Sequence, residues 1–148
     1  MNIAFDTSVL IGLLDPHDLW HSQAVALRSA LQSAGFIGIY FDCVLAETIS
    51  TATRRLRERK RIAEIDPLLD RTITNFPPDS LTWISFDTPI LYSEILSLIR
   101  SSRGELNFND ALVALSCRER DIRFIASFDS DFDQLAWLKR LSQPGDVT

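Results

Sequence analysis

The segment "IRFIASFDSDFD", Ile122–Asp133, places a short β-rich run directly before three aspartates at alternate positions, Asp129, Asp131 and Asp133. The run predicts a β-strand that ends just before the acids. A second run of this kind, "NIAFD" at residues 2–6, also ends on an aspartate. Acidic residues that follow strands point to an open α/β sheet, in which ligands bind beyond the carboxyl ends of the strands.

The three aspartates do not form a calcium loop of their own. An EF-hand loop that begins at Asp129 needs glycine at its sixth position and a bidentate glutamate at its twelfth. Those positions hold Gln134 and Arg140. The acidic stretch is therefore expected to be one part of a larger site whose other members lie elsewhere in the chain.

Short β-rich runs alternate with longer segments of helical period along the rest of the chain. Further strands are expected at residues 36–41 and 81–86, with a short fifth strand at 137–141. Helices are expected at 16–35, 43–60, 88–100 and 109–120, and in a further segment that is interrupted near Pro67 and runs to about residue 75. This alternation predicts an α/β fold with a mainly parallel sheet.

Proline, glycine and threonine indicate where several of these helices begin and end. Pro16 suits the first turn of the first helix, and Gly35 suits its C-terminal cap. Thr88 is expected as the cap of the helix at 88–100, with Pro89 at its first position.

Length and composition predict one domain that spans residues 1–148. The chain is 46% hydrophobic, and no apolar run reaches the roughly 18 to 20 residues that cross a bilayer. A soluble, cytoplasmic protein with no membrane contact is therefore expected. Cys43 and Cys117 lie far apart with no nearby histidine, so neither a disulfide framework nor a zinc site is indicated.

The net charge of −5 argues against a protein that coats nucleic acid, because that mode of binding relies on basic side chains that neutralise phosphates. It does not exclude an enzyme that reaches phosphates through bound cations. Basic residues are concentrated in one place, since Arg54–Arg61 holds six of the fifteen.

Carboxylates from four separate segments are expected at the carboxyl edge of the sheet. They are Asp6 after the first strand, Glu47 early in the helix after the second, Asp110 in the first turn of a later helix, and Asp129 with Asp131 after the fourth strand. Like charges so close together raise one another's pKa, and divalent cations remove the conflict. Oxygen ligands of this kind suit Mg²⁺ or Mn²⁺ and a one- or two-metal phosphodiester hydrolysis.

Four motifs in this order carry a family resemblance: "FDTSVL", "LAE", "FNDALVAL" and "SFDSDF". Together they resemble the motifs of PIN-domain nucleases, particularly the VapC-type toxins of toxin–antitoxin pairs. The resemblance covers nearly the whole chain. It implies a three-layer α/β/α sandwich around a mainly parallel sheet of four to five strands, and Mg²⁺- or Mn²⁺-dependent cleavage of RNA.

The resemblance also implies roles for individual residues. The catalytic residues would be Asp6, Glu47, Asp110 and Asp129, and the metal ligands would be Asp6, Asp110, Asp129 and Asp131. Thr7 and Ser8 would hold the loop after the first strand, and Asn109 would cap the helix that carries Asp110. Asp133 is expected to be only a helix acid.

The expected partners are an RNA substrate, a cognate antitoxin protein and a second copy of the chain in a homodimer. Arg54, Arg55, Arg57 and Lys60 are the candidates for contact with the RNA backbone. An ordinary solvated helix end explains the same basic run equally well, and contact with an acidic antitoxin tail is a third explanation.

Two other functions remain open from the residues. A receiver-like phosphoacceptor module would use Asp87, Ser127 and Lys139, although it needs an acidic pair after the first strand, where Asp6 stands alone. The second alternative is a catalytically inactive PIN-like binding protein.

Overall fold

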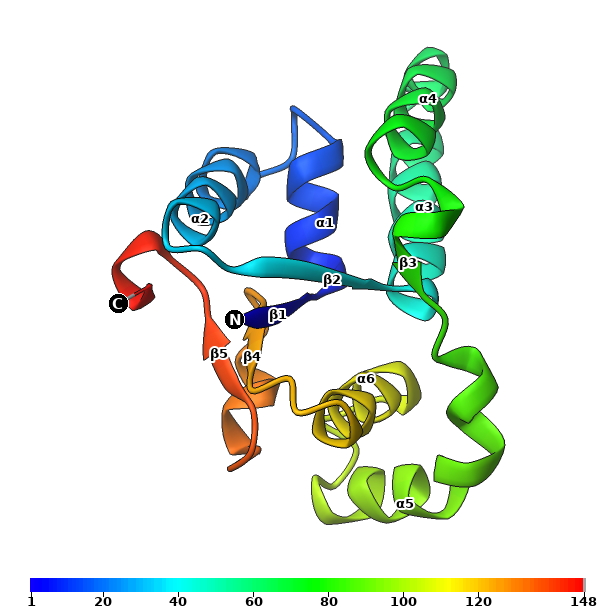
Figure 1. Cartoon of the computed structure of the whole chain (residues 1–148). Helices are drawn as coiled ribbons and strands as arrows, with labels where there is room; N and C mark the ends of the chain where they lie inside the picture. The colour runs from blue at the N-terminus through cyan, green and yellow to red at the C-terminus, as the bar shows by residue number, and fades with distance from the viewer. Residues whose placement is uncertain (148) are drawn as a thin grey trace.

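The computed structural model describes residues 1–147, and within them five strands form one parallel sheet. The order across the sheet is β3-β2-β1-β4-β5, and every neighbouring pair is parallel (Figure 1). The strands are β1 Asn2–Phe5, β2 Ile37–Phe41, β3 Leu81–Thr82, β4 Phe124–Ala126 and β5 Lys139–Leu141. The first strand of the chain, β1, is thus the central strand of the sheet, and the carboxyl ends of β1 and β4 lie side by side.

Six α-helices within residues 1–147 surround the sheet. They are α1 Thr7–Leu14, α2 His21–Ser33, α3 Asp42–Glu58, α4 Ile65–Asn75, α5 Thr88–Ser101 and α6 Phe108–Glu119. Figure 1 shows α1 and α2 on one side of the sheet and α5 and α6 on the other, with α3 and α4 packed together near β3. The expected three-layer α/β/α architecture around a mainly parallel sheet is therefore confirmed.

The core lies between the sheet and its two helical layers. Ile3, Ala4 and Phe5 of β1 are buried, as expected for a central parallel strand covered on both faces. In α6 the whole run Ala111–Cys117 is buried. The middle of this helix is therefore enclosed on all sides, whereas Phe108 in its first turn is 38% exposed.

At the N-terminal end one helix was missed, and the start of another was predicted too early. Residues 7–14 form α1, which the sequence did not indicate, because "TSVLIGLL" is apolar on nearly every face and shows no helical period. Pro16 lies in the turn that follows α1, and α2 begins only at His21. Gly35 does end α2, with a φ of +77° that favours glycine.

The middle of the chain also differs in detail. The interruption expected near Pro67 lies earlier, at a short 3-10 helix Ile62–Glu64, and Pro67 is in the first turn of α4, where proline is tolerated. The strand expected at 81–86 ends at Thr82. The reason is a tertiary contact, because the Asp42 carboxylate at the start of α3 accepts the backbone N–H groups of Ile84 and Ser85, at 2.8 and 3.3 Å, in place of a strand partner.

The helix after β3, α5, begins at Thr88 as predicted, but Thr88 is not its cap. Asp87 is its capping residue, Thr88 is already helical and Pro89 follows in the first turn. None of the helices in residues 1–147 combines the length and the apolar character that a membrane crossing requires.

The contact between α1 and α2 gives a test of the packing. A Cβ at Gly12 would lie 2.9 Å from the Cβ of Ala24, which is closer than side chains can approach. We expect Gly12→Ala to lower the free energy of unfolding by about 1 kcal/mol, because overpacking costs about 1 to 3 kcal/mol and exceeds the ~1 kcal/mol that alanine gains in a helix. Denaturant unfolding measures the difference.

Gly145→Ala is the matched control, because a Cβ there meets nothing within 4 Å. Its unfolding midpoint should match that of the unchanged protein. A Gly12→Ala variant that is as stable as the unchanged protein, or more so, would contradict the tight contact.

Candidate active site

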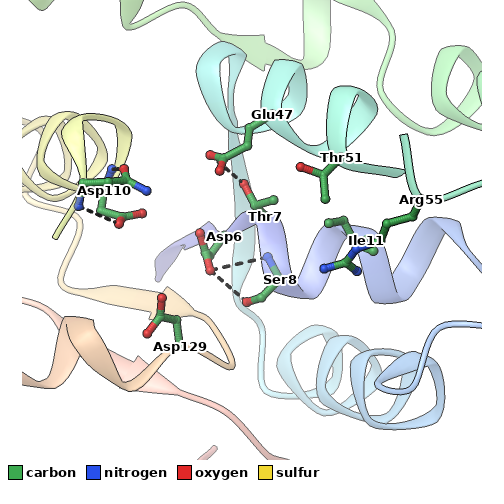
Figure 2. Close-up of a pocket in the computed structure, with 10 residues that line it drawn as sticks. Asp6, Thr7, Ser8, Ile11, Glu47, Thr51, Arg55, Asp110 and Asp129 are labelled. Carbon is green, nitrogen blue, oxygen red and sulfur yellow. Dashed lines mark hydrogen bonds between the residues drawn. The ribbon is translucent and has the colours of Figure 1, made fainter. Parts of the chain in front are cut away.

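One cavity of about 230 Å³ opens at the carboxyl ends of β1 and β4, between α1, α3 and α6. Four carboxylates reach it from four chain segments that are far apart in sequence (Figure 2). The lining residues are Asp6, Thr7, Ser8, Ile11, Glu47, Thr51, Arg55, Asn107, Asp110 and Asp129. The structure thus brings together the four acids that the sequence analysis selected as catalytic.

Asp6 joins the end of β1 to the start of α1. Its backbone N–H donates to Ala126 O at 3.0 Å, which continues the β1–β4 pairing by one step. Its side chain, at 7% exposure, caps α1 and accepts hydrogen bonds at Oδ2 from the hydroxyls of Ser8 and Ser127, at 2.8 and 2.7 Å. Two charge-assisted donors satisfy one carboxylate oxygen and orient the other.

The two serines also hold the loop after β4. Ser8 Oγ accepts the N–H of Phe128 at 3.0 Å, and Ser127 Oγ accepts the N–H of Asp129 at 2.9 Å. Ser8 was expected to hold the loop after the first strand, and its hydroxyl also holds the loop that carries Asp129. Ser127 is fully buried, and the sequence analysis did not select it for this site. Its position one residue after the strand was the available signal.

Glu47 lies in the second turn of α3 and faces the cavity. Its Oε2 accepts a hydrogen bond from Thr7 Oγ1 at 3.3 Å and a longer one from Asn109 Nδ2 at 3.5 Å. Thr7 therefore orients a carboxylate, and α1 and α6 both contact Glu47. One carboxylate oxygen of Glu47 is left for the cavity.

Asp110 sits in the first turn of α6 and stabilises the start of that helix. Its Oδ2 accepts the N–H of Asn107 at 3.0 Å, while Asn107 Oδ1 accepts the N–H of Asp110 at 2.9 Å, which is a reciprocal capping box. The prediction that Asn109 caps this helix was wrong, because Asn107 does so. Asn109 supports the site through Glu47 instead.

The pKa of Asp110 is raised to about 6. Partial burial is the main cause, and the negative charges of Asp6, Glu47 and Asp129 add to it, against the lowering effect of the Asn107 N–H. The four carboxylates therefore interact electrostatically although no two of them share a hydrogen bond. A site of this kind favours a bound cation.

The three aspartates that follow β4 have different surroundings. Asp129 lines the cavity and caps a short 3-10 helix, Ser130–Gln134, through the N–H of Asp131 at 2.9 Å. Asp131 lies outside the cavity lining, and its pKa is raised by partial desolvation and by the charges of Asp129 and Glu105. Asp133 forms an ion pair with Arg140 at 2.7 Å, in agreement with a helix acid.

The basic residues of α3 separate into two groups. Arg55 lines the cavity, beside Thr51 and Ile11 (Figure 2). Arg54, Arg57 and Lys60 are exposed and lie outside the lining. Arg54 is engaged at 3.8 Å with Glu58, one helical turn away.

The donor chemistry of the cavity fits a hard divalent cation. Carboxylate oxygens are the ligands that Mg²⁺ and Mn²⁺ prefer, and a cation would relieve the charge conflict at Asp110. Among the residues that the structure describes, no three Asp, Glu, His or Cys side chains stand close enough together to hold one ion at once. The acids surround the cavity, and side-chain rotation would be needed to converge on an ion.

The receiver-like alternative finds no support in this geometry. Asp87 lies away from Asp6, pairs with Arg120 at 2.6 Å and lines a different cavity, with Ile90 and Leu91. The sheet order also differs from the 2-1-3-4-5 order of receiver folds.

Comparisons with known proteins agree with the fold. The crystal structure of VapC20 from Mycobacterium tuberculosis, described as a sarcin-ricin loop cleaving toxin, is similar with a TM-score of 0.68 and 20% identity, over 93% of this chain and 97% of the VapC20 chain. Among curated proteins none gives a significant match. A family model described as "PIN domain" matches residues 3–138, and the chain therefore belongs to the PIN-domain family.

Proposed function

We propose that this protein is a Mg²⁺- or Mn²⁺-dependent endoribonuclease that hydrolyses phosphodiester bonds in RNA. The observation that carries the proposal is the meeting of four carboxylates, from four separate segments, around one cavity. Membership of the PIN-domain family, a family of nucleases, supports the same chemistry. Residues 1–148 would act as one catalytic domain in the cytoplasm.

Asp6, Asp110 and Asp129 are the residues that would hold the cation, and Asp131 would join them after movement of its loop. A cation held by these residues would lower the pKa of an attacking water and would stabilise negative charge on the phosphate. Ser8 and Ser127 fix one oxygen of Asp6, so that the other is directed at the cavity. Loss of either hydroxyl would loosen this orientation.

Glu47 would take the proton from the attacking water. Thr7 and Asn109 hold Oε2 of this carboxylate, and Oε1 is left to accept a proton. Asp110 must be ionised to bind a cation. With a pKa of about 6, it is ionised in neutral solution. The same four side chains therefore account for cation binding and for proton transfer.

We further propose that the protein is the toxin of a toxin–antitoxin pair, with a cognate antitoxin as its partner and a homodimer as its assembly. The likeness to VapC20, itself described as a toxin, supports this role. An inactive PIN-like binding protein is the competing proposal. The presence of an acid at each of the four cavity positions favours an active enzyme.

The proposal predicts metal-dependent cleavage that the cavity acids control. Purified protein incubated with mixed RNAs and Mg²⁺ or Mn²⁺ should give discrete fragments, and EDTA should abolish them. Asp6→Asn and Asp110→Asn should each lower the cleavage rate by about 10²-fold or more, because each removes a charged oxygen from the cation site. Gel electrophoresis of end-labelled RNA measures the rate.

Asp70→Asn is the matched control, since this acid is exposed on α4 and does not line the cavity. Its cleavage rate should equal that of the unchanged protein. Cleavage that continues in EDTA, or in both cavity variants, would rule out the metal-nuclease mechanism. Absence of cleavage by the unchanged protein with every RNA would favour the inactive binding protein.

A second prediction concerns stability without metal. The raised pKa of Asp110 means that the folded protein holds this proton more tightly than the unfolded chain. Ionisation therefore destabilises the fold progressively between pH ~4 and pH ~6, and the effect is complete above that range. Asp110→Asn keeps an acceptor for the Asn107 N–H and removes the charge.

We expect metal-free Asp110→Asn to be more stable than the unchanged protein at pH 7.5 by about 1 kcal/mol, a value reduced for solvent screening of a partly exposed group. This corresponds to a gain of roughly 2 to 4 °C in Tm. The gain should vanish near pH 4, and added Mg²⁺ should raise the Tm of the unchanged protein more than that of the variant. Equal Tm values at pH 7.5 in EDTA would refute the charge conflict.

A further inference from the structure

Two aromatic side chains stack beside the acidic cavity, although neither belongs to its lining. Trp20, which directly precedes α2, stacks on Phe128 with ring centroids 5.1 Å apart and ring planes 24° apart. The backbone N–H of Phe128 donates to the cavity residue Ser8, and the next residue is Asp129. Trp20 is 43% exposed, so part of its ring is open to solvent next to the site.

A guanidinium group completes this edge of the cavity. Arg55 is the one lysine or arginine among the lining residues, and its side chain is 43% exposed. In Figure 2 it lies at the end of the cavity away from Asp110. The positive charge of Arg55 offers a binding point for an anion that enters beside the four carboxylates.

Asp18 connects the arginine to the aromatic pair. Its Oδ1 accepts the backbone N–H of Trp20 at 2.9 Å, and its Oδ2 contacts Arg55 Nη1 at 3.5 Å. The Asp18 side chain is only 9% exposed. One well-buried carboxylate therefore contacts both the Trp20 backbone and the Arg55 side chain.

The chemistry of this surface matches a single nucleotide that is not base-paired. An open aromatic face binds the π-face of a base, and stacking of this kind tolerates every base. A guanidinium binds phosphate oxygens. An acidic peptide would offer carboxylates to Arg55 but no planar partner for Trp20, and it would meet the repulsion of the cavity acids.

We infer that Trp20, Phe128 and Arg55 form a subsite for one unpaired nucleotide of the RNA substrate. The base stacks on Trp20, and an adjoining phosphate binds Arg55 as the chain enters the cavity. Asp18 is a positioning residue for both contacts. The inference rests on the proposed ribonuclease function and adds that the substrate must offer an unpaired nucleotide next to the cleaved bond.

Binding can be measured without cleavage in the Asp6→Asn background. The probe is a fluorescein-labelled single-stranded RNA of roughly 12 nucleotides and mixed sequence, followed by fluorescence anisotropy in Mg²⁺. We expect Trp20→Leu to raise the Kd about tenfold, which is about 1.4 kcal/mol. Trp20→Phe keeps an aromatic face and should stay within about threefold.

Trp83→Leu is the matched control, because Trp83 is also exposed, at 50%, but follows β3 and lies outside the cavity lining. Its Kd should be unchanged. The Tm of every variant is measured alongside, so that a loss of binding with a normal Tm is assigned to the subsite.

Arg55→Ala should raise the Kd and reduce the slope of log affinity against log salt by about 0.7, the value for one phosphate contact on a single strand. Arg55→Lys should restore most of the slope. Arg123→Ala is the control, because Arg123 is exposed just before β4, at the opposite edge of the sheet. A fully paired duplex of the same sequence should bind more weakly and should not respond to Trp20→Leu.

A Kd for single-stranded RNA that is insensitive to both Trp20→Leu and Arg55→Ala would overturn the inference. So would a paired duplex whose Kd responds to these substitutions as the single strand does. A labelled polyglutamate peptide that binds in a way sensitive to both substitutions, when RNA does not, would overturn it as well. Failure of the proposed function looks different. A protein that binds RNA with these dependences but cleaves none retains the subsite and loses the nuclease role. Cleavage that needs Asp6 but is unchanged by substitution of Trp20 and Arg55 would support the nuclease role and refute the subsite.

Discussion

The buried carboxylate of Asp6 is the point on which this arrangement depends. It ends the central strand, caps α1 and accepts the hydroxyls of Ser8 and Ser127. Because Ser8 and Ser127 also hold the backbone after β4, one carboxylate links two neighbouring strands and the loop that carries Asp129. The side chain that would bind a cation thus also organises the elements that present the other ligands.

Charge and stability oppose each other at this edge of the sheet. Asp110 is held by a capping box, which favours its ionised form, yet burial and three neighbouring carboxylates raise its pKa to about 6. A fold optimised for stability alone would separate these groups or pair them with basic residues, as Asp133 and Arg140 are paired. Within residues 1–147 none of the four acids forms an ion pair, and this arrangement supports the proposed function.

The sequence predicted the parallel sheet and the common location of Asp6, Glu47, Asp110 and Asp129, because both follow from local patterns, whereas Asp131 lies outside the cavity lining. A few consecutive residues are enough to predict strands such as "NIAF" and "IRFIAS" and to identify the acids that follow them. Predictions failed where the deciding contact was distant in sequence, or where the segment showed no hydrophobic period. The uniformly apolar α1 shows no period, β3 is shortened by the Asp42 side chain, and the site role of Ser127 requires the proximity of Asp6.

The capping box at the start of α6 has a consequence for how this chain can change over time. Asp110 stabilises the start of a helix whose body is almost wholly buried, and only its charge is needed for the proposed chemistry. Asparagine at this position would satisfy the first requirement and fail the second. The single substitution Asp110→Asn would therefore leave a folded protein without the proposed catalysis. An apolar residue at this position would instead destabilise the start of α6.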